Sequence, residues 1–497
     1  MQTETLFSST IAAVSTPRGK GGVALIRISG EEAAAVAGRC FFPKCGKSVG
    51  ELEARRAYFG DIVSGGKVID DGLCTLFRAP HSYTGEDMAE ISCHGGMLVT
   101  QRVLEAVFAA GAVPAAAGEF TRRAFVGGKL SLTKAEAIAE ILDARSDTQL
   151  EIAAAQRRGA LSEKLEEAEK ELIALCGAVY ARIDYPDEDL GEISDDEFAD
   201  RAAAVLCRLE ALASTYRAGS AIFEGINTVI CGAPNRGKSS LYNALAGEDA
   251  AIVTPIAGTT RDTLERDLPL GRVMLHLVDT AGIHGAADEV ERIGVARAET
   301  RVRGAELVFC LFDASQPFSD EDAALCELLS GIGAPKLALL NKLDVKCGVF
   351  TIPARYRALF CAVIEISAKS GEGLDRLRET VEDLFSVGAI ETSNGAVVTN
   401  ARQFAALTEA RTCVGDAIHA VRSGMGADVA SSDLERAIAT LGELDGRRVS
   451  EAIVSEIFSL FFVGKYVKRG SCHLKPSPLG EAKKFSSPRC AIRAFSA

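Results

Sequence analysis

Short hydrophobic runs separated by glycine-rich turns fill the first part of the chain. The segments 24–28 (ALIRI) and 89–92 (AEIS) have the length and the branched side chains of strands, and glycines cluster near residues 20 and 95. This pattern predicts an α+β domain over residues 1–120.

The pattern changes to helix from about Leu132. Stretches rich in Ala, Leu and Glu run to about Arg217, and Thr133 and Glu136 have the spacing of a capping box, in which each side chain satisfies a free backbone N–H at the helix start. The acidic run between Asp184 and Asp200 favours a solvated turn between two helices. We expect this helical segment to cover residues 121–218.

Strands and helices alternate from Ile226 onwards. The segments TVIC, SSLYNALAG, VMLHLV, LVFCLFDA and KLALLN follow one another with the rhythm of a doubly wound α/β sheet. We expect this α/β domain to cover residues 219–385.

Amphipathic helical patterns return after about Glu391, at residues 401–421 and 433–444. Two helical blocks, 121–218 and 386–465, therefore flank the α/β domain. The simplest architecture is a multidomain α+β protein in which the α/β domain is inserted into one helical domain built from both blocks.

Composition fits this division. The chain has 497 residues, of which 47% are hydrophobic and 25% charged, and roughly 100–200 residues per domain predicts about three domains. A net charge of −13 excludes a polycation that coats nucleic acid, so any RNA contact requires a local basic patch. The tail, residues 466–497, has seven Lys or Arg against one Glu and is predicted to be mostly disordered, with an inert tail favoured over one that touches RNA.

The 14 cysteines are irregularly spaced, without a C-x-x-C pair, which is typical of reduced thiols in a cytosolic protein. The N-terminal segment lacks the apolar core of a signal peptide, and no apolar run approaches the ~18 residues that span a bilayer. We therefore expect a cytoplasmic protein without a membrane partner.

Residues 232–239 (GAPNRGKS) match the phosphate-binding pattern G-x-x-x-x-G-K-S between a strand and a helix. Glycines let backbone N–H groups wrap the phosphates, and the helix N-terminus favours their negative charge. Lys238 is expected to reach the β- and γ-phosphate oxygens, and the Ser239 hydroxyl to bind Mg²⁺.

Two further segments predict the rest of the phosphate and magnesium site. Asp279 begins DTAG after a strand, where its carboxylate can hold Mg²⁺ through water and the Gly282 N–H can sense the γ-phosphate. Thr260, in the preceding GTTRD loop, is the candidate second hydroxyl on Mg²⁺. Ile283 stands where some GTPases have a glutamine that orients the attacking water, so hydrolysis needs another group or a partner, or is very slow.

Base recognition is predicted from NKLD at 341–344 and SAK at 367–369. The Asp344 carboxylate can accept hydrogen bonds from guanine N1–H and the N2 amine, which adenine lacks, so this motif selects GTP over ATP. The Ala368 N–H can contact guanine O6. A chance origin is negligible for these motifs in this order, each at a strand end.

With these motifs, the chain from Ser9 to Lys465 resembles the bacterial and organellar tRNA-modification GTPase family MnmE, also called TrmE. The landmarks are STIAAVSTPRGKGGVALIRISG at the start, SYTGEDMAEISCHGG at 82–96, GEFTRRAFVGGKLSLTKAEAIAEILDA at 118–144, IDYPDEDL at 183–190, IVTPIAGTTRD at 252–262 and DTAGIHGAADEVERIG at 279–294.

The resemblance implies a K⁺-stimulated GTP hydrolase that is a homodimer through its N-terminal domain. It implies an FAD-dependent partner, MnmG (GidA), joined as a heterotetramer, and modification of the wobble uridine of tRNA at C5. A 5-formyl- or methylene-tetrahydrofolate bound by the N-terminal domain would supply the one-carbon unit.

The resemblance also assigns residues. The Asn235 side chain, with Thr254, Ile256 and Thr259, is expected to hold a K⁺ ion that offsets charge on the transferring phosphoryl group. Glu291 matches the residue that positions water; from the residues alone, a solvated carboxylate at a helix start is the favoured alternative. The predicted catalytic residues are Lys238, Thr260 and Glu291. The predicted GTP-binding residues are Asn235, Arg236, Gly237, Lys238, Ser239, Ser240, Thr254, Thr259, Thr260, Asp279, Gly282, Asn341, Lys342, Asp344, Ser367, Ala368 and Lys369.

Arg27, Glu90, Lys129 and Lys465 match folate-contacting positions of the family. Arg and Lys suit the glutamate tail of a folate, and a carboxylate suits the amino-pyrimidine edge. The alternative for Lys129 is a lysine on a surface turn. For Arg27 the alternative is weaker, because a charge on an apolar strand needs a partner.

One departure from the family pattern concerns the family's C-x-G-K ending. The matching residues here are 461–465 (FFVGK), with Phe462 at the cysteine position, and the chain continues past Lys465. Phenylalanine cannot perform thiol chemistry. Either the modifying activity is altered or lost, or the cysteine is dispensable. The alternative function is a GTP-gated RNA or ribosome-assembly switch without modification chemistry.

Overall fold

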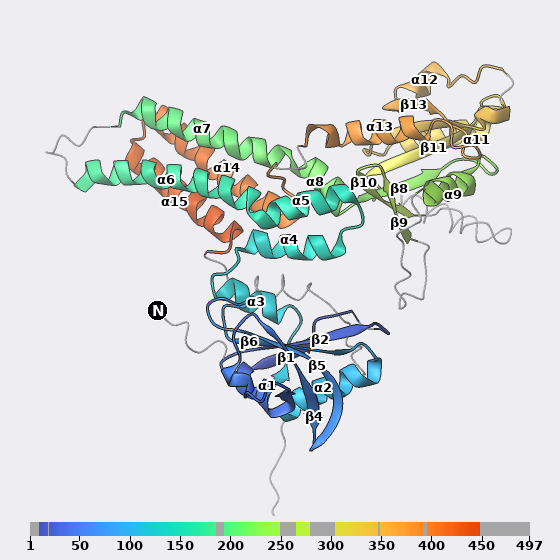
Figure 1. Ribbon diagram of the computed structural model, residues 1–497. Helices are drawn as coiled ribbons and strands as arrows, with labels where there is room; N and C mark the ends of the chain where they lie inside the picture. Colours follow the sequence, from blue (N-terminus) through green and yellow to red (C-terminus); the bar gives the residue numbers. More distant parts are fainter. Residues whose placement is uncertain are drawn as a thin grey trace, which may run out of the picture.

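The computed structural model describes residues 9–17, 19–184, 193–248, 265–278, 304–345, 348–390 and 395–447. Figure 1 shows a sheet-and-helix domain at the start of the chain, a group of long helices beside it, and a second α/β domain at one end of these helices. Within these ranges, each helix is too short or too polar to cross a membrane.

The N-terminal domain is a mostly antiparallel sheet covered by two helices. Its strands lie in the order β3-β4-β5-β6-β2-β1-β7, and only β7 is parallel to its neighbour β1. The elements are β1 (Ile11–Val14), β2 (Val23–Ser29), α1 (Ala33–Cys40), β3 (Phe41–Pro43), η1 (Val49–Glu51), β4 (Ala57–Ser64), β5 (Lys67–Phe77), β6 (Met88–His94), α2 (Met97–Ala109) and β7 (Val113–Pro114).

Alternation along β2 explains how this sheet is packed. Ile26 and Ile28 are buried in one core with residues of α1 and α2, because alternate side chains of a strand point to the same face. Arg27 lies between them and is paired in register with Glu90 of β6. The predicted strands 24–28 and 89–92 are thus confirmed within β2 and β6.

The helical domain is built from two chain segments. The first contributes α4 (Leu132–Asp143), α5 (Asp147–Arg158), α6 (Ala160–Asp184), α7 (Asp195–Ser214) and α8 (Tyr216–Phe223), and the second α14 (Ala401–Arg422) and α15 (Ala427–Leu444). The preceding helix α3 (Glu119–Val126) instead binds the N-terminal domain, where its Arg123 pairs with Glu86 at 3.1 Å. One core joins α6, α7, α14 and α15 of the two segments, including Leu172 of α6, Phe198 of α7, Val414 of α14 and Leu434 of α15. This confirms the prediction of a single helical domain formed around an insertion.

The predicted capping box at Thr133 and Glu136 is wrong. The N-cap of α4 is Ser131, whose hydroxyl accepts the Lys134 N–H at 3.3 Å. Thr133 is buried and donates instead to Asp445 at the end of α15 (2.7 Å), and Glu136 is bound by the Arg402 guanidinium (2.7 Å). Tertiary contacts therefore take both side chains that the local pattern assigned to the helix start.

The inserted α/β domain has a sheet with the strand order β13-β12-β11-β8-β10-β9, in which only β9 is antiparallel to its neighbour. Its elements are β8 (Ile226–Cys231), α9 (Lys238–Glu248), β9 (Glu265–Leu270), β10 (Val273–Val278), β11 (Leu307–Asp313), α11 (Asp320–Ser330), β12 (Lys336–Asn341), η4 (Leu343–Val345), α12 (Ala354–Arg357), β13 (Ala362–Glu365), α13 (Leu374–Leu384) and η5 (Val387–Ala389).

Both faces of this sheet are buried, as a doubly wound fold requires. Along β11, Phe309 and Leu311 belong to one core, while Cys310 and Phe312 belong to the core on the opposite face. The continuous apolar run LVFCLF is therefore the expected sequence of a central parallel strand, and the predicted α/β fold is confirmed.

The core of the α/β domain continues into the neighbouring helices. Ile152 of α5 and Ile222 of α8 belong to the same core as Leu275 of β10. The buried Gln149 amide also donates to the Ile222 carbonyl at 2.7 Å. These contacts fix α5 and α8 against the inserted domain.

Candidate nucleotide site

The loop between β8 and α9 has the backbone shape of a phosphate cradle. Asn235 (φ 61°) and Gly237 (φ 97°) have left-handed conformations, which turn successive N–H groups toward one side. A Cβ on Gly237 would lie 2.2 Å from the Asn341 side-chain nitrogen, so only glycine fits there. The helix that follows, α9, begins at Lys238 and directs its N-terminus at the loop.

Lys238 lies over this loop. Its ammonium donates to the carbonyls of Gly232 (2.7 Å) and Ala233 (3.0 Å). The hydroxyl-bearing residues Ser239 and Ser240 lie in the first turn of α9 and are exposed. The lysine and a hydroxyl that could bind Mg²⁺ are therefore both at the mouth of the loop.

The base-recognition motif meets the phosphate loop through Asn341, the last residue of β12. Its amide nitrogen donates to the Arg236 carbonyl (2.9 Å), and its Oδ1 accepts the Ala368 N–H (3.0 Å). Phosphate loop, NKLD and SAK segments are thus brought together. The Ala368 N–H predicted to meet guanine O6 is engaged by Asn341 in this arrangement.

Asp344 offers an exposed carboxylate beside this contact. Its Oδ1 accepts a hydrogen bond from the Ser367 hydroxyl at 3.0 Å. This bond fixes the Asp344 side chain, so that its other carboxylate oxygen, Oδ2, has a defined position. Lys369, the last residue of the SAK segment, is exposed. A carboxylate accepts hydrogen bonds only, as contacts to guanine N1–H and the N2 amine would need.

Lys342 has a positive φ of 68°, and its ammonium donates to Asp313 at 2.7 Å. Burial works to raise the pKa of Asp313, but hydrogen bonds from Lys342 and Ser315 outweigh it and hold the pKa below its usual value. Asp313 is a site residue that our sequence analysis did not single out. It could have been found in the sequence as the acidic residue that directly follows the apolar run LVFCLF, at the carboxyl end of the predicted strand.

The Arg236 side chain turns away from the nucleotide face of the loop. It is 5% exposed and binds Asp322 of α11 at 3.0 Å. Only the backbone of Arg236 remains available for the predicted GTP contact.

Several predicted residues lie outside the described ranges. They are Thr254, Ile256, Thr259, Thr260, Asp279, Gly282, Ile283, Glu291, Phe462, Lys465 and the tail 466–497.

In the N-terminal domain, two of the predicted folate-contacting residues, Arg27 and Glu90, form an ion pair with each other. The Arg27 guanidinium donates to Glu90 through Nε and Nη2, both at 2.8 Å, and lies 5.2 Å from the centre of the Tyr83 ring. The exposed Lys129 ammonium donates to the Pro80 carbonyl at 2.8 Å. The pair Arg27–Glu90 presents a charged donor and acceptor next to an aromatic face.

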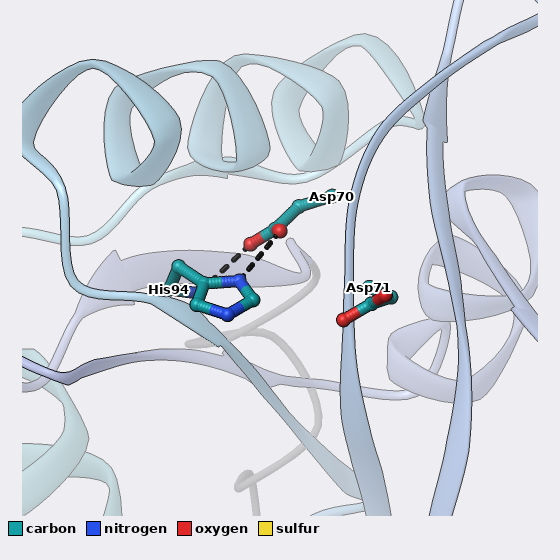
Figure 2. A group of neighbouring side chains, drawn as sticks. All are labelled: Asp70, Asp71 and His94. Carbon is teal, nitrogen blue, oxygen red and sulfur yellow. Dashed lines mark hydrogen bonds and ion pairs between the residues drawn. The ribbon is translucent and has the colours of Figure 1, made fainter.

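Figure 2 shows Asp70, Asp71 and His94, which could together offer one metal-ligand atom each within 4.8 Å of one another. Asp70 accepts both the backbone N–H of His94 (2.8 Å) and its ring nitrogen Nδ1 (2.7 Å). The hydrogen bonds account for the Asp70–His94 pair without an ion, and we assign no metal here.

Two family models match the chain. "GTP-binding protein TrmE N-terminus" matches residues 10–129, and "MnmE helical domain" matches residues 132–461.

Proteins named tRNA modification GTPase MnmE are similar along almost the whole chain. The Lactobacillus helveticus protein is 39% identical over 466 residues, which cover 93% of this chain and 100% of that protein. The Geobacillus kaustophilus protein is 37% identical over 459 residues, covering 92% and 99%. The Clostridioides difficile protein is 37% identical over 459 residues, covering 92% and 100%.

Among solved structures, the G domain of the T. maritima FeoB iron transporter is 24% identical, covering 32% of this chain and 98% of that chain with a TM-score of 0.24. The Methanococcus maripaludis elongation factor SelB is 18% identical, covering 32% and 34%, with a TM-score of 0.24.

Proposed function

The chain belongs to the MnmE family of tRNA modification GTPases, and from this we propose a K⁺-stimulated GTP hydrolase that modifies C5 of the wobble uridine of tRNA with an FAD-dependent partner, MnmG. Family membership makes it a GTPase with a role in tRNA modification. The observation that carries the nucleotide site is the Asn341 side chain, which joins the phosphate loop to the SAK segment. The protein acts in the cytoplasm as a homodimer and forms a heterotetramer with MnmG.

Hydrolysis uses the phosphate loop and the segments that follow it. Backbone N–H groups of the loop and Lys238 hold the β- and γ-phosphates, and Ser239 and Thr260 bind Mg²⁺, which offsets phosphate charge. This assignment is supported by the Lys238 ammonium, which lies over the loop, and by the exposed Ser239. Glu291 positions the attacking water.

A K⁺ ion supplies the charge that an arginine finger supplies elsewhere. Asn235 gives a side-chain oxygen, and Thr254, Ile256 and Thr259 complete the site. The exposed position and positive φ of Asn235 support this role, because they leave its amide at the edge of the loop.

Folate binding is the proposed task of the N-terminal domain. Arg27, Glu90, Lys129 and Lys465 contact a 5-formyl- or methylene-tetrahydrofolate, which supplies a one-carbon unit when bound. The residues present fit such a ligand, since Arg27 and Glu90 offer complementary charges and the Tyr83 ring lies beside them. Phe462 at the family's cysteine position bears on the modification step, not on GTP hydrolysis.

The test is nucleoside mass spectrometry of tRNA from a host that lacks its own homologue and expresses this chain. Return of the C5-modified uridine, together with GTP hydrolysis faster in K⁺ than in Na⁺, is the expected result. Normal hydrolysis without the modified uridine contradicts the modification role and favours a GTP-gated RNA or ribosome-assembly switch. Folate binding to the full chain separates the two, because an assembly switch has no use for a one-carbon donor.

A further inference from the structure

Arg236 and Asp322 form a buried ion pair behind the phosphate loop. Their side chains are 6% and 0% exposed, and Arg236 Nη2 lies 3.0 Å from Asp322 Oδ2. The same guanidinium donates to the Ser319 hydroxyl (3.0 Å) and the Gln316 side chain (3.4 Å). The side chain is therefore held from several directions by the segment between β11 and α11.

Asp322 also closes the capping box at the start of α11, where its Oδ2 accepts the Ser319 N–H (3.0 Å) and the Ser319 hydroxyl (2.8 Å). Within the described residues, Arg236 Nε and Asp322 Oδ1 are buried without a hydrogen-bond partner. Burying two charges costs desolvation free energy that an incompletely bonded pair does not recover well. A buried ion pair is weak evidence for added stability, and this one can instead fix the position of the groups bonded to it.

Two routes lead from Arg236 to the base-recognition motif. Its carbonyl accepts the Asn341 side-chain amide at 2.9 Å. Its guanidinium also lies 3.8 Å from Asp313 Oδ2, the same oxygen that accepts the Lys342 ammonium at 2.7 Å. Arg236 is therefore linked to two consecutive residues of NKLD. Its backbone carbonyl is bonded to Asn341, and its guanidinium shares the Asp313 carboxylate with Lys342.

We propose that Arg236 is a positioning residue for guanine recognition. Clamped by Asp322, it sets the distance between the phosphate loop and the motif that carries Asp344. A nucleotide bound at its phosphates then has its base presented to Asp344 in the geometry that detects the N2 amine. The inference rests on the GTP site of the proposed function and adds a specificity role to a side chain that touches no nucleotide.

The test uses the full chain and the apolar double variant Arg236→Met with Asp322→Leu, since replacing both charges avoids leaving one buried alone. The matched control is Arg272→Met with Glu382→Leu, which removes an ion pair (3.0 Å) between the β9–β10 turn and α13. Arg236→Lys is a third variant, because lysine keeps the charge but lacks the planar fork. Dissociation constants for GDP and IDP, which lacks the N2 amine, are measured by competition with fluorescent GDP.

We expect the IDP/GDP ratio of dissociation constants to fall about tenfold in the apolar variant, the size of one lost hydrogen bond to a charged group. Arg236→Lys is expected to lower the ratio less, and the control to leave it unchanged. If both nucleotides weaken equally, or neither weakens, the positioning role is refuted. A wild-type chain that binds neither nucleotide refutes the proposed GTP site instead.

Discussion

Asp344 provides the sharpest test of guanine selection at the level of one residue. Asp344→Asn replaces an acceptor with an amide that also donates, so we expect GTP binding to weaken by roughly 1.5–3 kcal/mol and xanthosine triphosphate, which has a carbonyl at C2, to bind better. Competition binding of the two nucleotides measures this. Asp375→Asn, at an 87% exposed side chain in the same domain, is the control and should change neither affinity. Retained GTP preference in Asp344→Asn contradicts our interpretation of NKLD.

The His94–Asp70 contact predicts a pH dependence. The hydrogen bond and charge of Asp70 raise the pKa of His94 above 6.5. Because the folded pKa is raised, the stabilisation is full below about pH 6.5, the unfolded value, and is lost as pH rises through the folded pKa. NMR titration of the imidazole should give a midpoint above 6.5 that falls in Asp70→Asn and falls less in Asp71→Asn. Equal shifts in the two variants would show that the bonded partner is misassigned.

At the scale of elements, glycines in two helices predict opposite responses to alanine. A Cβ on Gly219 of α8 would lie 2.1 Å from the Val398 carbonyl oxygen, whereas a Cβ on Gly415 of α14 would meet nothing within 4 Å. Gly219→Ala must displace backbone and should cost about 1–3 kcal/mol of unfolding free energy. Gly415→Ala should gain about 0.5–1 kcal/mol, the difference in helix propensity. Chemical denaturation measures both free energies of unfolding. If Gly219→Ala left the free energy of unfolding unchanged, α8 would not pack against Val398, in the segment that follows the inserted domain.

Periodic elements could be predicted from the sequence, and the partners of individual side chains could not. The alternation around Arg27 and the apolar run of β11 follow from burial on one or two faces, which is a local property of a strand. Thr133 was predicted to cap a helix because Glu136 follows it at the three-residue spacing of a capping box, which is a pattern within one turn of the chain. Its actual partner, Asp445, is distant in sequence, and the hydroxyl of Ser131 takes the cap.

The same limit applies to the site. Asn341 and Asp344 could be predicted because their chemistry follows from motif spacing at the end of a strand. The buried Arg236 side chain and the shared Asp313 could not, since G-x-x-x-x-G-K-S leaves the Arg236 position unspecified and the pairing depends on α11. A motif fixes the backbone that meets the ligand, while tertiary packing decides what supports it.

For the whole molecule, the insertion predicts how far nucleotide binding is felt. The inserted domain shares its core with α5 and α8, through Ile152 and Ile222, whereas α6, α7, α14 and α15 surround a separate core. A ligand at 100 times its dissociation constant stabilises the body that binds it by about 2.7 kcal/mol. We therefore expect GDP to slow hydrogen exchange in β8, β11, α5 and α8 by up to about a hundredfold, and to leave the core of α6 and α14 nearly unchanged. Hydrogen-exchange mass spectrometry with and without GDP resolves these peptides. Equal protection of both cores would mean that the two domains open as one cooperative unit.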